Sequence, residues 1–484
     1  MEVIMDLRYN PELMVIGDSL AQGCRSLSVS QEFCWQSYGA RISSTLGWPF
    51  VAPDHPRPVC FDAEALIRKS GLIVDLLSAF IIISKLKKTV KKNLKSWQKD
   101  LARGEPLSKH LCFDNIGIAG TKIPDLMQRS AASSIAEAES RLSDKDLDEC
   151  SIADIASLAA SLHIPFNAAF TLNPSMKKKY ASWSPMDWVE QRRPKRLIVQ
   201  TGHNHGLFNV GFSASRSLIS YASLDGADEL ALRLAKLPEE TGEIYWMLLP
   251  KVSAVANLIA KGSLNDGYGE EYRSAFNPSA AQPLAGTELA AIDRSIQDTN
   301  EAIMRRFREI FESVQPGNAK RLWFIDTYEL LTKYDYKNTG IEEKIIHAGK
   351  QRINNRRLDG KSSYIGRPNM DTRKRKRGGK LIDGGFQSAD GMHPSGVGYA
   401  VFASDIMHFM GMPHDRQKLL VKAFKEDRLL DRYPLQLDSI FSIIDLLQKF
   451  EKDPQQEPSL KLQEKESMEL NEFIGFMKQS LQIE

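Results

Sequence analysis

Five predominantly apolar runs, separated by longer stretches with helical spacing, constrain the fold of this chain most strongly. They are residues 13–16, 111–116, 196–201, 243–250 and 321–326. Short apolar runs bounded by turn residues are typical of strands buried inside a parallel sheet. Because these runs alternate with helical segments, we expect an α/β fold in which helices cover both faces of a five-stranded parallel sheet.

The segments between the runs are long and mostly helical in pattern. Apolar spacing predicts helices over residues 32–46, 67–101, 125–162, 287–311, 416–450 and 460–481. Within 67–101, Lys85, Lys88, Lys92 and Lys99 lie on a face other than the apolar one. Two interpretations stay open: a helix packed on its own domain, or a basic amphipathic helix that acts as a lid or lies on a membrane. Its apolar run is too short to span a bilayer.

The length of 484 residues, with 42% hydrophobic and 26% charged residues, is typical of a soluble globular protein. It fits about three domains of ordinary size, or one α/β domain with large insertions. We predict one domain over residues 1–412, with a helical insert at about 60–110 and a basic loop at about 350–380. A helical C-terminal extension over residues 413–484 follows.

Charge is distributed unevenly along the chain. Residues 350–380 carry twelve Lys and Arg against two acids, a net charge of +10. Since the whole chain has a net charge of +3, about −7 remains for the rest. The basic stretch is interpreted either as a solvated loop or as a surface for anionic head groups. No aromatic residues interleave with the charges of residues 373–377, so we expect no nucleic-acid partner.

The cysteines and the N-terminus indicate a reducing compartment. Five cysteines are an odd number without the spacing of a disulfide framework or a zinc site, so we expect free thiols. The first apolar run begins twelve residues after Met1, which leaves no room for the apolar core of a signal peptide before it. We therefore expect a cytoplasmic protein.

The first apolar run leads into a turn that places a serine at the sheet edge. Gly17 allows a tight turn after the strand, and Asp18 and Ser19 stand where a helix would begin. The carboxyl ends of parallel strands are where open α/β sheets hold their ligands. By itself, a Gly-Asp-Ser turn is more often a helix cap than a catalytic site.

A second polar segment follows the basic stretch. Asp390 and His393 are three residues apart in a turn-rich sequence, so the carboxylate can face the imidazole Nδ1. That contact would fix the tautomer and leave Nε2 free to accept a proton from a serine. Alone, such a pair is more often structural. A catalytic role for the pair is favoured here because a serine, a glycine-rich segment and an asparagine also follow predicted strands.

Taken in chain order, four segments resemble the GDSL or SGNH family of serine ester hydrolases. They are Gly17-Asp18-Ser19-Leu20, Asn115-Ile116-Gly117-Ile118-Ala119-Gly120, Gly202-His203-Asn204 and Asp390-Gly391-Met392-His393-Pro394. The segments span most of residues 13–410, but the matched residues are a small part of that span. Ser19 lacks the Gly-x-Ser-x-Gly sequence of ordinary α/β-hydrolases. His205 stands where the family commonly has an acid, which leaves the local hydrogen bonding of that loop open.

The resemblance implies a three-layer α/β/α sandwich and a role for each matched residue. Ser19 would be the nucleophile, His393 the base and Asp390 the acid that stabilises the imidazolium. The oxyanion hole would consist of the Ser19 N–H, the Gly120 N–H and the Asn204 side-chain amide. This chemistry requires neither a metal nor a cofactor.

The substrate and partners are less constrained. The basic stretch and the helix over 67–101 favour acylated lipids or phospholipids as substrates and peripheral contact with an anionic membrane. The alternative is a carbohydrate O-acetylesterase, because a polar cleft would suit an O-acylated sugar. The C-terminal helices are expected to pack on the domain itself, and the alternative is a protein partner. A hypothesis of another class is a non-catalytic binding or scaffold protein on a hydrolase-like frame.

Overall fold

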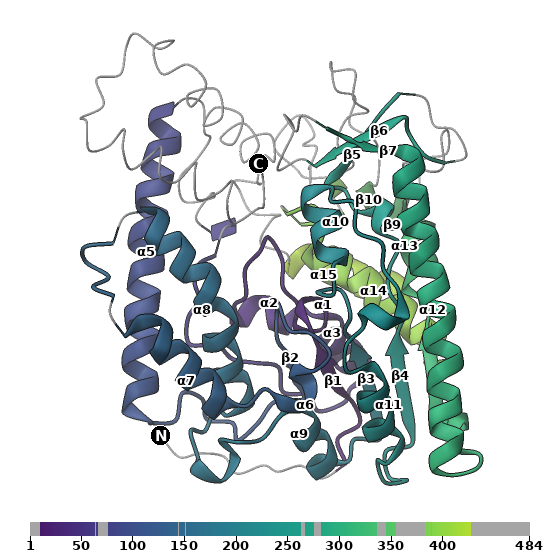
Figure 1. Cartoon of the computed structure of the whole chain (residues 1–484). Helices are drawn as coiled ribbons and strands as arrows, with labels where there is room; N and C mark the ends of the chain where they lie inside the picture. Colours follow the sequence, from purple (N-terminus) through teal and green to yellow (C-terminus); the bar gives the residue numbers. More distant parts are fainter. Residues whose placement is uncertain are drawn as a thin grey trace.

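Five parallel strands form the central sheet of the computed structural model, in the order β2-β1-β3-β4-β8 (Figure 1). Their bounds are β1 Met14–Gly17, β2 Asn115–Gly117, β3 Arg196–Gln200, β4 Glu243–Met247 and β8 Leu322–Ile325. Each predicted run contributes one strand, so the predicted five-stranded parallel sheet is confirmed. The structure describes residues 10–426 except 63, 66–75, 144, 151, 263–266, 275–281, 336–344, 355–382, 385 and 389.

Alternate side chains of each strand enter two separate apolar cores. Met14 and Ile16 belong to one core, and Leu13 and Val15 belong to the other. This period of two is the geometry of a strand buried on both faces. The first core is covered mainly by α9 Pro185–Arg192, α11 Ala227–Ala235 and α12 Gly286–Val314. The second is covered by α3 Tyr38–Leu46, α13 Thr327–Tyr334, α14 Gly396–Phe409 and α15 Arg416–Glu426.

A third apolar core lies among three helices, which are located beside the sheet (Figure 1). It is built by α5 Leu76–Arg103, α7 Ala131–Leu142 and α8 Ile152–Leu172. Val90, Leu94 and Trp97 of α5 are buried in it, while the four lysines noted in the sequence are exposed. The described part of α5 therefore has the first of its two expected arrangements, a helix packed on its own domain. In the part of the chain that the structure describes, no helix is long and apolar enough to cross a membrane.

The remaining elements are short. The helices are α1 Ser19–Gln22, α2 Gln31–Trp35, α6 Asp125–Gln128 and α10 Leu207–Ser213, with 3₁₀ turns η1 Lys178–Tyr180, η2 Tyr221–Ser223, η3 Val252–Ala254 and η4 Asn318–Arg321. Two small three-stranded sheets were not predicted. One contains β5 Leu258–Lys261, β6 Glu271–Ser274 and β7 Leu284–Ala285, and the other β9 Ile345–Ala348, β10 Gln351–Asn354 and β11 Asp383–Gly384.

Several predicted boundaries differ from those of the structure. Strand β2 begins at Asn115 instead of residue 111, because Asp114 donates its N–H to the Val51 carbonyl (2.7 Å) and forms an ion pair with Arg192 (2.6 Å). The helix expected over 32–46 is divided into α2 and α3, where Ser37 accepts the N–H of Ala40 and caps a new helix. Likewise, the helical range 125–162 contains three helices, α6, α7 and α8.

The predicted basic loop and C-terminal extension fall largely outside the described residues. Residues 350–354 lie in and next to β10, and residues 355–382 and 427–484 are not described. Helix α15 packs on α14, and its Leu419, Leu420 and Phe424 are buried in the second core. The self-packing expected for the C-terminal helices thus holds for α15.

Candidate active site

The turn after β1 fixes the position of Ser19. Gly17 has φ +145°, and a Cβ on it would lie 1.8 Å from the Gln200 carbonyl oxygen, so no side chain fits there. Asp18 donates its N–H to the same carbonyl (2.9 Å). Its carboxylate accepts the Leu20 N–H (3.2 Å) and caps α1. Ser19 is therefore held at the carboxyl end of β1, beside the end of β3.

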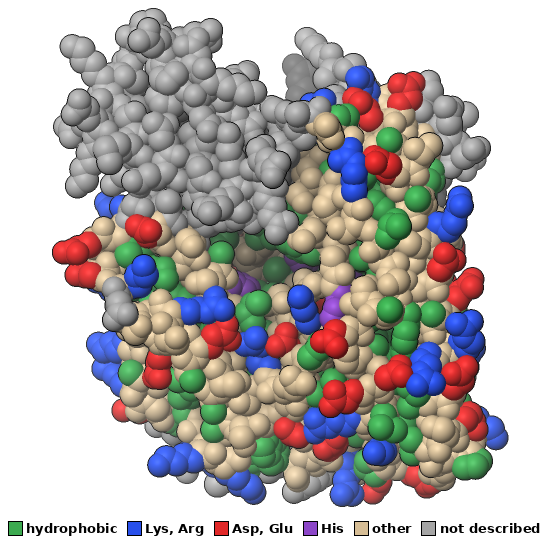
Figure 2. Space-filling view, in the orientation of Figure 1, with side chains coloured by type: hydrophobic (Ala, Val, Ile, Leu, Met, Phe, Trp, Pro, Cys, Tyr) green, Lys and Arg blue, Asp and Glu red, His purple; other side chains and the backbone are tan. Residues whose placement is uncertain are grey.

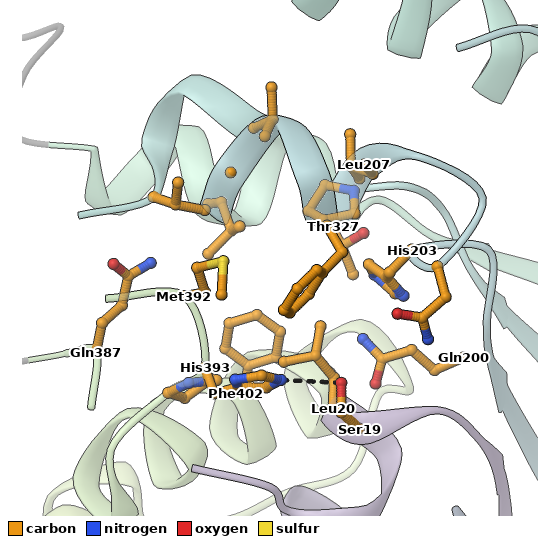
Figure 3. Close-up of a pocket in the computed structure, with 18 of the residues that line it drawn as sticks. Ser19, Leu20, Gln200, His203, Leu207, Thr327, Gln387, Met392, His393 and Phe402 are labelled. Atoms are coloured by element: carbon orange, nitrogen blue, oxygen red, sulfur yellow. Dashed lines mark hydrogen bonds between the residues drawn. The ribbon is translucent and has the colours of Figure 1, made fainter. Parts of the chain in front are cut away.

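A continuous chain of hydrogen bonds joins Ser19, His393 and Asp390. The Ser19 Oγ lies 2.9 Å from His393 Nε2, and His393 Nδ1 lies 2.7 Å from Asp390 Oδ2 (Figure 3). Since an ionised carboxylate only accepts, Nδ1 carries the proton and Nε2 is left to accept the serine O–H. All three residues are at least 90% buried. The fold thus brings the Ser19 hydroxyl to the Asp390/His393 pair, although Ser19 and His393 are 374 residues apart in the sequence.

Asp390 is buried but well supplied with hydrogen-bond donors. Its Oδ1 accepts the backbone N–H groups of Met392 and His393 (2.9 Å each) and the Ser388 hydroxyl (3.2 Å). Its Oδ2 also accepts the Leu27 N–H (2.9 Å). These donors hold the carboxylate in one orientation, because rotating it would break several bonds at once.

Burial and charge act in opposite directions on this Asp/His pair. Burial by itself would raise the pKa of Asp390, but the charge of His393 and the hydrogen bonds that the carboxylate accepts outweigh burial and lower this pKa. Burial would lower the pKa of His393, but the charge and hydrogen bond of Asp390, together with the charge of Asp18, raise it. The pair therefore favours an ionised carboxylate beside an imidazole that accepts a proton readily.

A turn at Ser26 and Leu27, which was not predicted from the sequence, holds Asp390 in place through hydrogen bonds. Ser26 and Leu27 both have left-handed backbone conformations (φ +52° and +53°), which is costly for residues other than glycine. In this conformation the Ser26 N–H bonds the Ser388 hydroxyl (2.9 Å), while the Leu27 N–H bonds Asp390. The turn is anchored by a fully buried ion pair between Arg25 and Glu64 (3.0 Å). Nothing in the local sequence signals this contact.

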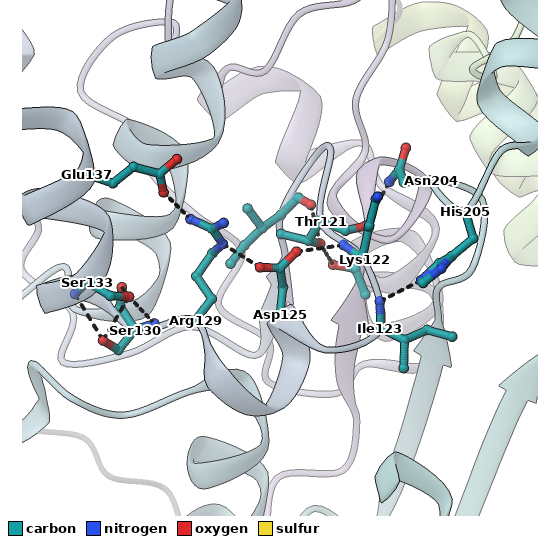
Figure 4. A network of polar contacts seen from close by, with 12 residues as sticks. Thr121, Lys122, Ile123, Asp125, Arg129, Ser130, Ser133, Glu137, Asn204 and His205 are labelled. Carbon is teal, nitrogen blue, oxygen red and sulfur yellow. Dashed lines mark hydrogen bonds and ion pairs between the residues drawn. The ribbon is translucent and has the colours of Figure 1, made fainter. Parts of the chain in front are cut away.

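Besides the Ser19 N–H, the expected oxyanion donors are Gly120 and Asn204, which lie on adjoining loops. Asn204 Nδ2 donates to the Thr121 carbonyl (2.8 Å), which ties its loop to the residue after Gly120 (Figure 4). The second hydrogen of that amide has no acceptor among the described residues. Gly120 has φ +90°, and a Cβ there would lie 2.8 Å from the side chain of Ile164 on α8. Asn204 lines the pocket beside Ser19, but Gly120 is not among the lining residues.

His205 joins the Asn204 loop to two neighbouring segments. Its contacts show the local hydrogen bonding of this loop, which the sequence left open because the family commonly has an acid at this position. Its Nδ1 donates to the Ser223 carbonyl (3.0 Å), and its Nε2 accepts the Ile123 N–H (3.2 Å; Figure 4). Burial lowers the pKa of this half-buried ring, consistent with a neutral imidazole that both donates and accepts. Both ring nitrogens of His205 are therefore occupied.

A pocket of about 70 Å³ opens beside Ser19 and His393 (Figure 3), and Figure 2 shows a hollow with apolar and histidine side chains near the middle of one face. Its walls come mainly from segments that follow β3, β4 and β8. The apolar lining residues are Leu20, Leu207, Phe208, Pro250, Val252, Val255, Leu331, Phe386, Met392, Pro394 and Phe402. The pocket is therefore apolar on most sides and polar near the hydroxyl.

Two further polar residues lie beside the nucleophile and were not assigned a role from the sequence. His203 Nδ1 pairs with the buried Asp18 carboxylate at 2.6 Å. Gln200, the last residue of β3, is fully buried and lines the pocket. His203 belongs to the Gly202-His203-Asn204 segment and Gln200 lies two residues before it, but only the fold shows that both face the same space as Ser19.

Comparisons with protein-family models, curated proteins and solved structures found no match. The geometry of the chain itself is therefore the basis for any functional assignment. The described residues contain no group of three His, Cys, Asp or Glu side chains arranged to hold a metal ion. The five cysteines are free, and four of them are buried.

Proposed function

We propose that this chain is a serine ester hydrolase of the GDSL/SGNH type. The observation that carries the proposal is the hydrogen-bonded chain from Ser19 Oγ through His393 to Asp390, at the carboxyl end of a parallel sheet. A surface serine or an isolated Asp/His pair commonly has a purely structural role. A buried hydroxyl that bonds the free nitrogen of an Asp-oriented imidazole is the arrangement that nucleophilic catalysis requires.

The reaction would proceed in two steps. His393 Nε2 takes the Ser19 proton while Oγ attacks the ester carbonyl carbon, and the same proton then passes to the leaving alkoxide oxygen. Water, deprotonated by His393, next attacks the acyl-enzyme, and His393 returns that proton to Ser19 Oγ as the Oγ–C bond breaks and the acid is released. Asp390 stays ionised and stabilises the imidazolium formed in each step. Both tetrahedral intermediates would be stabilised by the Ser19 N–H, the Gly120 N–H and the Asn204 amide.

The small volume beside Ser19 supports a short acyl group as the one bound there. An engineered cavity of about 150 Å³ holds one benzene molecule, and the pocket beside Ser19 has about half that volume, 70 Å³. A carbohydrate O-acetyl ester or another short-chain ester fits this volume. The lipid alternative, with an anionic membrane as partner, depends on the basic stretch over 350–380, most of which lies outside the described residues.

The scaffold hypothesis predicts no turnover, so the test is hydrolysis of p-nitrophenyl acetate and butyrate by wild type and Ser19→Ala. Loss of a catalytic serine lowers kcat by about 10⁶, which would bring the variant to background. Ser44→Ala is the matched control, because Ser44 is exposed on α3. Its rate should equal that of wild type. Activity retained in Ser19→Ala would refute the serine mechanism, and an inactive but folded wild type would favour the scaffold hypothesis.

A further inference from the structure

Most polar side chains that line the pocket are already hydrogen-bonded within the protein. The Gln387 amide oxygen accepts the Ala256 N–H (2.5 Å), and the Thr327 hydroxyl donates to the Leu248 carbonyl. Ser19, His393 and Asn204 make the contacts described above. Gln200 and His203 are different, because they present polar atoms without a partner among the described residues.

The Gln200 side-chain oxygen and nitrogen and the His203 Nε2 are buried, and no described residue bonds any of the three. Gln200 is 0% exposed and His203 is 9% exposed. Leaving a buried polar group unpaired is energetically unfavourable, so a partner is expected for such a group. Since both residues line the pocket, a polar atom of a bound substrate is a natural partner for them.

The chemistry of the three atoms defines the partner. The Asp18 carboxylate accepts from His203 Nδ1, so Nε2 is an acceptor in the neutral ring and a donor in the protonated ring. The Gln200 amide supplies a donor and a second acceptor. A hydroxyl donates and accepts at a single atom, so it can pair with His203 Nε2 in either ring form and with the Gln200 amide. A saturated hydrocarbon chain would leave all three atoms unpaired.

The position of Gln200 places this recognition close to the reacting carbonyl. Gln200 is the register partner of Gly17, and its carbonyl accepts the Asp18 N–H at 2.9 Å. Gln200 and His203 lie on the same side of the pocket in Figure 3, near Ser19 and opposite Gln387. The hydroxyl they bind would therefore be only a few bonds from the scissile ester.

We infer that Gln200 and His203 form a hydroxyl-recognition site, and that the enzyme acts on short esters with a free hydroxyl near the scissile bond. This inference rests on the proposed ester hydrolysis and adds its substrate class. The hydroxyl could belong to the acyl part, as in a 3-hydroxyacyl ester, or to the alcohol part, as in an ester of a polyol or sugar. The chemistry of recognition is the same in both.

The test uses two pairs of esters of matched size, with and without the hydroxyl. The acyl pair is 4-methylumbelliferyl 3-hydroxybutyrate and 3-methylbutyrate, and the alcohol pair is 2-hydroxyethyl butyrate and propyl butyrate. For each pair, the ratio of kcat/KM with and without the hydroxyl is measured on the full chain. Wild type should favour the hydroxylated ester by about tenfold or more in one pair, and that pair identifies which side of the ester carries the group.

Two variants should abolish recognition of the hydroxyl while keeping the Ser19 nucleophile. Gln200→Met keeps the length of the side chain but has no amide. His203→Asn keeps a donor for Asp18 in place of Nδ1 and lacks Nε2, which limits the risk of misfolding. Each should reduce the ratio to about one, with thermal melting as the check on folding. Phe208→Leu changes an apolar wall of the same pocket and should preserve the ratio.

Failure of this inference is distinguishable from failure of the proposed function. A wild-type ratio near or below one in both pairs, with Ser19-dependent hydrolysis intact, would overturn hydroxyl recognition only. A preference that survives in both Gln200→Met and His203→Asn would also overturn it. If a folded wild type hydrolyses none of the four esters, the proposed function falls, and this inference falls with it.

Discussion

At the level of single residues, Asp390 controls the protonation of His393. Burial lowers the pKa of His393, but Asp390 beside it outweighs burial and raises this pKa above its usual 6.5. Since only the neutral imidazole can take the serine proton, kcat/KM should rise with pH through a midpoint above 6.5. A pH profile of wild type measures this midpoint directly.

The variant Asp390→Asn should change this profile in a defined direction. The neutral amide removes the charge that raises the pKa of His393, so the midpoint should move to lower pH. Turnover should fall by about 10⁴, because the amide no longer holds the productive tautomer. A midpoint that moves to higher pH, or does not move in a folded variant, would contradict the role given to Asp390.

The role proposed for Asn204 differs from those proposed for Ser19, His393 and Asp390, because it concerns charge that would develop during the reaction. Asn204→Ala should lower kcat by about 10²–10³ and leave KM little changed, since the amide would meet the oxyanion and not the ground-state ester. Steady-state kinetics on p-nitrophenyl butyrate separate the two parameters. A change confined to KM would assign Asn204 to substrate binding instead.

At the level of elements, the turn containing Ser26 and Leu27 connects stability to the site. Arg25→Met leaves Glu64 buried without its ion-pair partner Arg25, which should lower the free energy of unfolding by about 3–5 kcal/mol. Arg25→Met combined with Glu64→Leu should recover much of this loss, because no unpaired charge remains. Urea unfolding provides the measurement.

The exposed ion pair of Arg216 with Glu288 is the matched control for that experiment. Arg216→Met should shift the unfolding midpoint far less, since water solvates both groups. Equal shifts for Arg25→Met and Arg216→Met would show that the buried pair does not anchor the turn.

The five strands of the central sheet were predictable from the sequence, but the start of β2 and the two small sheets were not. Residues such as Ile198 and Trp246 lie in short apolar runs between turn residues, and a strand buried on both faces is the usual structure of such a run. Strand β2 was overextended because Asp114 bonds Val51 and Arg192, which are distant in sequence. The two small sheets were missed because strands such as β6 and β10 include charged residues, Arg273 and Arg352, and therefore form no apolar run.

At the level of the whole molecule, the site is assembled from loops that the sheet order brings to one edge. Strand β1 lies between β2 and β3, so the turn bearing Ser19 is flanked by the loops bearing Gly120 and Asn204. The motif segments were enough to predict that Ser19, His393 and Asp390 meet, whereas Gly120 does not line the pocket. Gln200 and His203 could not be recognised in this way, because their significance depends on which buried polar atoms lack partners.

The central claim is that Ser19 is a nucleophile activated by His393. Mass spectrometry of the intact protein after reaction with a fluorophosphonate, followed by peptide mapping, tests it most directly. The account predicts one adduct per wild-type chain, located on Ser19, and at most very slow labelling of His393→Ala. Labelling at another residue, or equally fast labelling of Ser19 in wild type and His393→Ala, would contradict it.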